Sequence, residues 1–187
     1  MIIGMKITKK KYGVMLMNVK LISYSQGNHT NLLEEVAYAA RVSNPANQNN
    51  TDTSEKLVRY LIKNHHWSRL EMVSVCLEIN TTRDIARQIL RHRSFSFQEF
   101  SQRYADASQL GFETREARLQ DTKNRQNSIE ISDEMTAETI GLQTTWNSYQ
   151  KDVEKLVSEA YTWALENGIA KEQARAVLPE GMTKSRM

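Results

Sequence analysis

The residues best suited to chemistry lie in one stretch, from Arg91 to Tyr104, where fixed positive charge stands beside hydroxyl and amide groups. The stretch holds three arginines, a histidine, a glutamate and three serines. A guanidinium group offers a planar fork of donors that fits phosphate or carboxylate oxygens in pairs. Serine and glutamine add neutral donors that suit a uracil-like edge or a ribose. For Arg91 alone, a solvated helix end with a cation at its negative pole explains the charge. The whole stretch predicts a site for an anionic ligand.

The residues just before this stretch predict a helix over 82–91, with Thr81 or Thr82 as the N-cap and Asp84 in the first turn. Gln88 and Arg91 are three residues apart and would share a polar face. Successive helical residues are about 100° apart, so the side chains of residues 91–93 would fan out in different directions. Either the helix ends at this triplet, or the three side chains serve pockets shared between subunits.

The triplet Arg91-His92-Arg93 is followed by seven residues, then Ser101, one further residue and Arg103. This arrangement resembles the signature of the flavin-dependent thymidylate synthases. These enzymes methylate dUMP to dTMP with methylenetetrahydrofolate as carbon donor, and NADPH reduces their FAD. The segment 174–179 also resembles the family's Ala-Arg-x-x-Leu-Pro, whose arginine contacts dUMP; here it is Arg175. The resemblance thus implies two co-substrates, NADPH and methylenetetrahydrofolate, beside dUMP and FAD.

The resemblance also assigns ligands to individual residues. The dUMP site would comprise Gln88, Arg91, Glu99, Phe100, Ser101, Gln102, Arg103 and Arg175. The FAD site would comprise Ser43, Ser68, Glu71, Arg91, His92, Arg93 and Glu99, and His66 would lie on the folate side. No metal site is expected, because the adjacent histidines 65 and 66 have no third ligand nearby in the sequence.

The composition is that of a soluble globular protein with a basic N-terminal arm. The 187 residues contain 25 basic and 22 acidic side chains, a net charge of +3, and four of the lysines lie within residues 1–16. We therefore expect an arm at 1–16 and a single catalytic domain at 17–187, with no nucleic-acid partner for the nearly neutral body. No run approaches the ~20 apolar residues of a membrane span. The single cysteine, Cys76, excludes an internal disulfide, and a cytoplasmic location is expected.

Hydrophobic patterning predicts an α/β (α+β) fold, in which an antiparallel or mixed sheet is flanked by helices that include one long C-terminal helix. Strands are expected at 17–24 and at 71–80, where apolar and polar residues alternate. Helices are expected at 31–42, from 53 or 54 to about 64, at 135–165 and at 171–177. Asn31 and Glu34 form a capping box at the first of these. The polar run 105–132 is predicted to be a gating or docking loop near the substrate opening.

Relatives in the resembled family continue for several dozen residues beyond the point that matches Met187. The arginine credited with activating dUMP lies in that continuation, so no catalytic residue is assigned within this chain. We expect either an N-terminal piece of an interrupted gene or a chain completed by a C-terminal polypeptide, and the resemblance implies a homotetramer with shared sites. One alternative is a non-catalytic or split-enzyme fragment that binds flavin or nucleotide. A basic RNA-binding protein is a further alternative, although the body outside the arm is nearly neutral.

Overall fold

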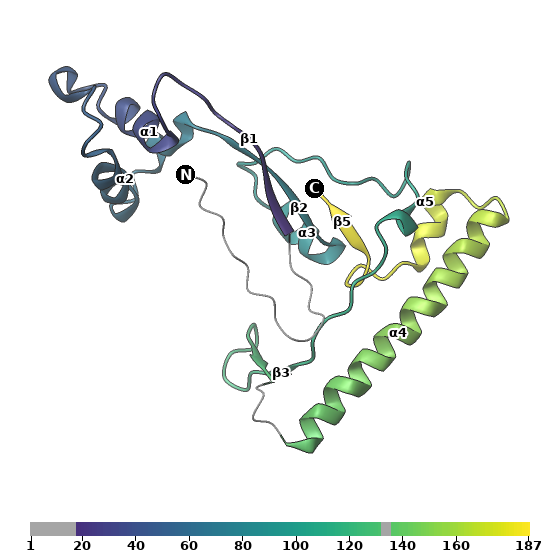
Figure 1. The fold of residues 1–187 in the computed structure, drawn as a ribbon. Coiled ribbons are helices and arrows are strands. Elements are labelled where there is room, and N and C mark those ends of the chain that lie inside the picture. The colour runs from purple at the N-terminus through teal and green to yellow at the C-terminus, as the bar shows by residue number, and fades with distance from the viewer. Residues whose placement is uncertain (1–17, 132–135) are drawn as a thin grey trace. The chain divides into compact units, whose positions relative to one another are not determined.

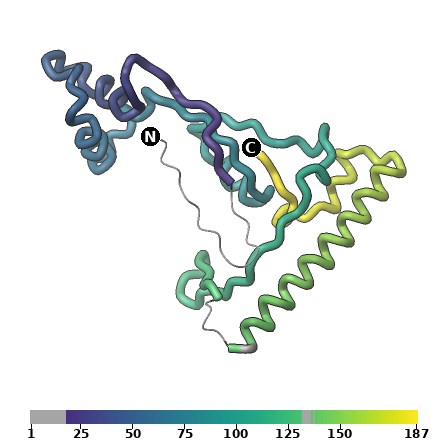
Figure 2. Tube along the Cα trace, in the orientation of Figure 1, coloured from purple at the N-terminus to yellow at the C-terminus, as the bar shows by residue number. Residues whose placement is uncertain are grey.

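The computed structural model describes residues 18–131 and 136–187, which divide into two compact units. The first unit comprises residues Val19–Glu78, and the second comprises Ile79–Met187 together with Asn18. The predicted arm at 1–16 lies outside the described residues. The elements can be followed by label in Figure 1 and along the chain trace in Figure 2.

The first unit is built around a pair of helices. Its elements are β1 (Asn18–Tyr24), α1 (Leu32–Ala40), a 3₁₀ turn (Pro45–Asn47), α2 (Ser54–Lys63), a second 3₁₀ turn (Trp67–Met72) and the first half of β2 (Val75–Thr82). Val36 of α1 packs against Val58 and Leu61 of α2, because residues three or four apart on a helix share one face. Ile62, also on α2, is exposed.

Helix α1 begins with the capping box that the sequence predicts. The Asn31 side chain accepts hydrogen bonds from the backbone N–H groups of Leu33 and Glu34, at 3.0 and 3.1 Å. The Glu34 carboxylate in turn accepts from the Asn31 side-chain amide at 2.9 Å and from the Thr30 N–H at 3.0 Å. Two otherwise unpaired donors of the first turn are thereby satisfied.

We expect Asn31→Ala to lower the free energy of unfolding by about 1 kcal/mol, because it removes both bonds to the first turn of α1. Urea unfolding followed by circular dichroism measures the change. Thr136→Ala is the matched control, since Thr136 occupies the N-cap of the long helix without any side-chain bond to it. Equal losses for the two variants would contradict this role of Asn31.

The second unit joins a short antiparallel strand pair to a long helix. In sheet order β1-β2-β5, strand β2 pairs antiparallel with β5 (Lys184–Arg186), so that Thr81 lies opposite Ser185. Helix α3 (Arg83–Ile89) follows β2 directly, then a 3₁₀ turn (Ala107–Gln109) and the hairpin β3 (Arg118–Gln120) and β4 (Ser128–Glu130). The chain continues as α4 (Ala137–Glu166), α5 (Lys171–Ala174) and a 3₁₀ turn (Arg175–Val177), before β5 (Figure 1).

The core of the second unit lies at the C-terminal end of α4. Tyr161 and Ala164 pack there against Ala107, Ala174 and Leu178, and the Tyr161 hydroxyl accepts a hydrogen bond from the Ala107 N–H at 3.2 Å. Gly168, at φ +78°, reverses the chain after α4, a conformation that costs glycine no Cβ clash. This core therefore brings α5, and the residues that follow it, against the segment that follows the arginine-rich stretch.

The predicted fold class is confirmed, including the long C-terminal helix. One detail of the prediction is wrong. The second strand begins at Val75 and not at Glu71, because residues 67–72 form a 3₁₀ turn, and Val75 and Leu77 are exposed in this chain. The polar run 105–132, for which a gating or docking role stays a prediction, contains the β3–β4 hairpin. Along α4, Tyr161 and Ala164 are buried, whereas Tyr149 and Leu156 are exposed in the single chain. None of the described helices has the length and apolar character needed to cross a membrane.

Candidate functional site

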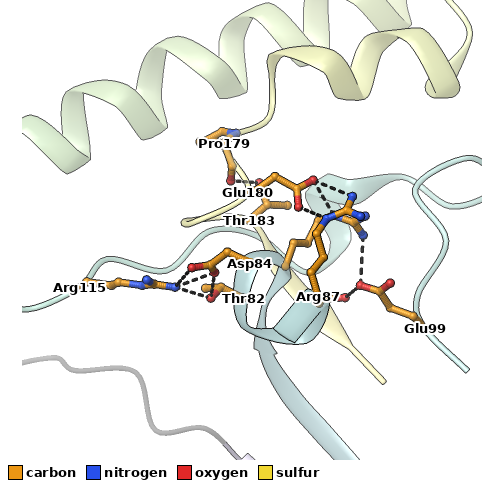
Figure 3. Close-up of polar contacts among 10 residues, drawn as sticks. Thr82, Asp84, Arg87, Glu99, Arg115, Pro179, Glu180 and Thr183 are labelled. Atoms are coloured by element: carbon orange, nitrogen blue, oxygen red, sulfur yellow. Dashed lines mark hydrogen bonds and ion pairs between the residues drawn. The ribbon is translucent and has the colours of Figure 1, made fainter. Parts of the chain in front are cut away.

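A network of charged side chains surrounds the start of α3 in the second unit. Glu99 accepts a hydrogen bond from the Ser185 hydroxyl at 2.7 Å, and its Oε1 lies 3.4 Å from Nη1 of Arg83. Nε of Arg83 lies 3.3 Å from Oε1 of Glu180, and Arg87 contacts both oxygens of that same carboxylate (Figure 3). The sequence predicted a ligand role for Glu99 alone among these five residues.

A second carboxylate is held on the other side of α3. Nη2 of Arg115 lies 2.7 and 2.8 Å from the two carboxylate oxygens of Asp84 and 2.7 Å from the Thr82 hydroxyl. The Thr82 hydroxyl also donates to Asp84 at 2.6 Å, so Thr82 occupies the predicted N-cap position but bonds to a side chain (Figure 3). Partial burial acts to raise the pKa of Asp84, but the hydrogen bonds from Thr82 and Arg115, with the charge of Arg115, outweigh it and leave that pKa lowered.

The Glu180 carboxylate also has a lowered pKa. The hydrogen bond from Arg87 lowers it, partial burial opposes this, and the charge of Arg83 lowers it further. The reciprocal effect raises the pKa of Arg87. The carboxylate therefore stays ionised to a lower pH in the folded chain than in the unfolded one.

We expect the stability of this unit to fall on acidification. A carboxyl group whose pKa is lowered by folding stabilises the folded state above its ordinary pKa, which is 4.5 for Glu180 and 3.8 for Asp84. That contribution is lost as the pH falls through the lowered values. Urea unfolding at pH 7 and at about pH 3.5 should show the loss, and it should be smaller in Arg87→Gln. Arg59→Gln removes an exposed ion pair with Glu55 and serves as control, with the wild-type pH dependence expected. An unchanged pH dependence in Arg87→Gln would contradict the assignment.

The arginine triplet lies just beyond α3. The helix ends at Ile89, with Leu90 as its C-cap. Of the two alternatives for residues 91–93, the structure therefore agrees with a helix that ends at the triplet. Nη1 of Arg91 donates to the side-chain oxygen of Gln88 at 3.3 Å, which places these two predicted dUMP residues together. The side chains of Arg91, His92 and Arg93 are exposed.

The other two predicted dUMP arginines meet at helix α5. Nε of Arg103 lies 3.6 Å from a Glu172 carboxylate oxygen, while Nε of Arg175 donates to the Glu172 backbone carbonyl at 3.1 Å. Nζ of Lys171 donates to the Tyr104 carbonyl at 3.2 Å and so ties the 101–104 segment to the same helix. Two arginines that are 72 positions apart in the sequence are therefore brought to one residue, Glu172.

Residues 101–105, which include Arg103, form a turn. The backbone N–H groups of Tyr104 and Ala105 both donate to the Ser101 carbonyl, and the Phe100 N–H donates to the Arg186 carbonyl of β5 at 2.8 Å. Gln102 is buried, and its amide nitrogen has no hydrogen-bond acceptor among residues 18–131 and 136–187. A buried donor without an acceptor is costly, which makes this amide a candidate for contact with a ligand.

Ser43, a predicted FAD residue, borders a cavity of about 540 Å³ in the first unit. The cavity lining also carries the side chains of Lys56, Asn44 and Asn47, which supply one cation and two amide groups. Buried Arg41 holds the loop around it, since its guanidinium contacts the Asn50 carbonyl and lies 2.7 Å from the Thr53 hydroxyl. This set of donors suits phosphate oxygens.

The remaining predicted residues of the first unit follow α2. His66 comes just before the 3₁₀ turn Trp67–Met72, which carries Ser68 and Glu71, and all three side chains are exposed. The His66 ring lies edge-on to Tyr60 at 6.1 Å between centroids. Each unit thus carries its own part of the predicted residues. Among the described residues, no group of three or more His, Cys, Asp or Glu side chains could hold a metal ion.

Sequence reasoning missed Arg83, Arg87, Glu180 and Ser185. The spacing of four between Arg83 and Arg87 was a usable signal, because it places both on one face of a helix. No local pattern, however, pairs either arginine with Glu180, which lies more than ninety positions away in the sequence. Ser185 likewise reaches Glu99 only through the pairing of β5 with β2.

Comparisons with known proteins agree on one family. A family model described as thymidylate synthase complementing protein matches residues 20–186. The chain is 48% identical over 166 residues to a probable flavin-dependent thymidylate synthase of Paramecium bursaria Chlorella virus 1, covering 87% of this chain and 74% of the relative. It is 51% identical over 144 residues to the flavin-dependent thymidylate synthase of Synechocystis sp., covering 77% of this chain and 62% of that relative.

A solved structure is similar as well. The UMP/dUMP methylase PolB from Streptomyces cacaoi, crystallised with 5-Br dUMP, superposes with a TM-score of 0.70 at 26% identity. The similarity covers 91% of this chain and 70% of that chain. The present chain therefore spans between 62% and 74% of the length of these relatives.

Proposed function

The chain belongs to the family of thymidylate synthase complementing proteins, the flavin-dependent thymidylate synthases, and on that premise we propose that it takes part in the reductive methylation of dUMP to dTMP. In this reaction methylenetetrahydrofolate donates the carbon, and NADPH supplies the reducing equivalents through FAD. The observation that carries the proposal is the meeting of Arg103 and Arg175 at Glu172, beside the turn that begins at Ser101.

The dUMP phosphate would be held by Arg103 and Arg175, because two guanidinium forks offer paired donors to its oxygens. Ser101 and Gln102 are neutral groups in the turn beside them, and the buried amide nitrogen of Gln102 is available as a donor. Glu99 would accept from an N–H or O–H of the nucleotide. The remaining proposed dUMP contacts are Gln88, Arg91 and Phe100.

The residues present also fit FAD. The cavity bordered by Ser43 offers the Lys56 cation and the amides of Asn44 and Asn47 to phosphate oxygens, as a dinucleotide needs. Proposed FAD contacts outside this cavity are Ser68, Glu71, Arg91, His92, Arg93 and Glu99, and His66 would lie on the folate side. When bound, FAD supplies the electrons that reduce the transferred one-carbon group. The role proposed for the chain's own residues is to bind and orient the ligands, and no catalytic residue is assigned among them.

The visible absorption spectrum of the purified chain, alone and with dUMP, tests the binding part of the proposal. Flavin bands that shift when dUMP is added would support a joint site for flavin and nucleotide. A chain that takes up neither FAD nor dUMP would contradict it. Because the spectrum reports on the flavin's surroundings, it does not depend on turnover.

A second measurement tests catalysis. With methylenetetrahydrofolate present, dUMP-dependent oxidation of NADPH by this chain would support the complete reaction. Binding of both ligands without turnover would favour the alternative, a non-catalytic or split-enzyme fragment that needs a C-terminal partner. Restored turnover on addition of the corresponding C-terminal segment of a relative would then identify a split enzyme.

We also propose that the chain assembles as a homotetramer with shared sites. In the single chain, large apolar side chains are exposed on β1 (Leu21 and Ile22) and along α4 (Tyr149, Leu156 and Trp163). Exposed apolar area of this extent is typical of a surface that another chain covers. Light scattering should then give about four times the 21.6 kDa mass of one chain.

A further inference from the structure

Among residues 18–131 and 136–187, the polar contacts of the Glu99 carboxylate all reach one of its two oxygens. Oε1 accepts the Ser185 hydroxyl at 2.7 Å and lies 3.4 Å from Nη1 of Arg83. Figure 3 shows the second oxygen directed away from these contacts. A carboxylate oxygen has two lone pairs, so the second oxygen can accept a donor from a ligand.

The groups that hold Glu99 are themselves fixed. The Arg83 side chain is only 8% exposed, and Glu180, which Arg87 also binds, holds its Nε. Ser185 is 2% exposed and lies opposite Thr81 in the strand pair. Neither side chain can turn away from Glu99 without breaking buried contacts, which would be costly.

The backbone beside Glu99 is tied to the same strand. The Phe100 N–H donates to the Arg186 carbonyl at 2.8 Å, next to the Ser185 contact. Strand β5 therefore holds this segment twice, once through its backbone and once through the Glu99 side chain. The turn that begins at Ser101 follows immediately, so the position of Glu99 and the position of the proposed dUMP residues are set together.

We infer that Ser185 and Arg83 are positioning residues, which orient the Glu99 carboxylate so that its second oxygen accepts a donor of bound dUMP. This inference rests on the proposed function, since it takes Glu99 to be a dUMP contact. Neither residue touches the ligand. Both act by restricting the Glu99 side chain to one orientation before the ligand arrives, and such preorganisation increases affinity.

The test is a double-mutant cycle with the dUMP dissociation constant as readout, measured by calorimetry and by the flavin absorption shift. Ser185→Ala should weaken dUMP binding about tenfold, and Ser185→Thr, which keeps the hydroxyl, should restore most of the affinity. In a Glu99→Gln background, Ser185→Ala should cost no further affinity, because the residue acts only through the Glu99 carboxylate. Ser108→Ala is the matched control: it removes a hydroxyl-to-carboxylate bond of 2.7 Å to Asp106 and should leave dUMP affinity unchanged.

Arg83→Lys extends the test to the second positioning residue. It keeps the positive charge but loses the fork that contacts both Glu99 and Glu180, so dUMP binding should weaken while circular dichroism stays as in the wild type. The inference would be overturned if Ser185→Ala weakened dUMP binding as much in the Glu99→Gln background as in the wild type. It would also be overturned if Ser185→Ala left the dUMP affinity of the wild type unchanged. A wild-type chain that binds no dUMP would instead contradict the proposed function, and the inference with it, so the two failures are distinguishable.

Discussion

Arg103→Ala and Arg175→Ala are each expected to weaken dUMP binding by about tenfold to a hundredfold, and the double variant by less than the product, because both arginines would bind one phosphate. Each change removes a charge-assisted contact to the phosphate, which is about twice as strong as a neutral hydrogen bond. Both guanidinium groups contact Glu172, which holds them at the same residue. Calorimetric titration with dUMP, and with deoxyuridine as the ligand that lacks phosphate, measures the effect.

The comparison between the two ligands assigns the loss to the phosphate. Affinity for deoxyuridine should be nearly unaffected by either variant, because it carries no phosphate for the arginines to bind. Arg103→Lys should recover part of the loss, since it keeps the charge but not the paired donors. Lys155→Ala, which removes an exposed charge from α4, serves as the control and should bind dUMP as the wild type does. Equal losses for dUMP and deoxyuridine would contradict a phosphate role.

The second large effect is expected on stability. Gln150→Ala should lower the free energy of unfolding by about 2–4 kcal/mol, because it leaves two backbone groups without their partners. The buried Gln150 side chain accepts from the Arg115 N–H at 2.7 Å and donates to the Arg115 carbonyl at 2.9 Å. Gln143, two helical turns earlier on the same face, accepts from the Ala117 N–H at 2.8 Å. The two glutamine side chains therefore hydrogen-bond to the backbone of residues 115–117, as a neighbouring β-strand would.

Urea unfolding measures this loss, with Lys155→Ala as the control on the same helix. Lys155 is exposed, so its replacement should change stability by no more than about 0.5 kcal/mol. Gln143→Ala, which removes one bond to the backbone of this segment and one to the Asn147 side chain, should lie between the two. A loss below about 1 kcal/mol in Gln150→Ala would mean that water satisfies the Arg115 backbone groups in its place. The role of α4 as a partner for this segment would then be wrong.

Local patterns were sufficient for several features. The capping box at Asn31 and Glu34 is confirmed, because its bonds join residues three apart. The long helix is confirmed, since helical periodicity acts within a few residues. The family was also recognisable from sequence, because the arginine-rich stretch and its spacing are contiguous.

Tertiary structure decided what the local patterns could not reach. The alternation at 71–80 predicted a half-buried strand, yet Val75 and Leu77 are exposed in the single chain, because burial depends on what covers a strand and not on its own residues. Likewise, the ion pair of Arg103 with Glu172 and the bond from Ser185 to Glu99 join residues 69 and 86 positions apart in the sequence. Such contacts form only when strand pairing and helix packing offset the entropy of closing long loops. The sequence alone therefore determined which residues are suited to bind a nucleotide, and the fold decided which of them meet.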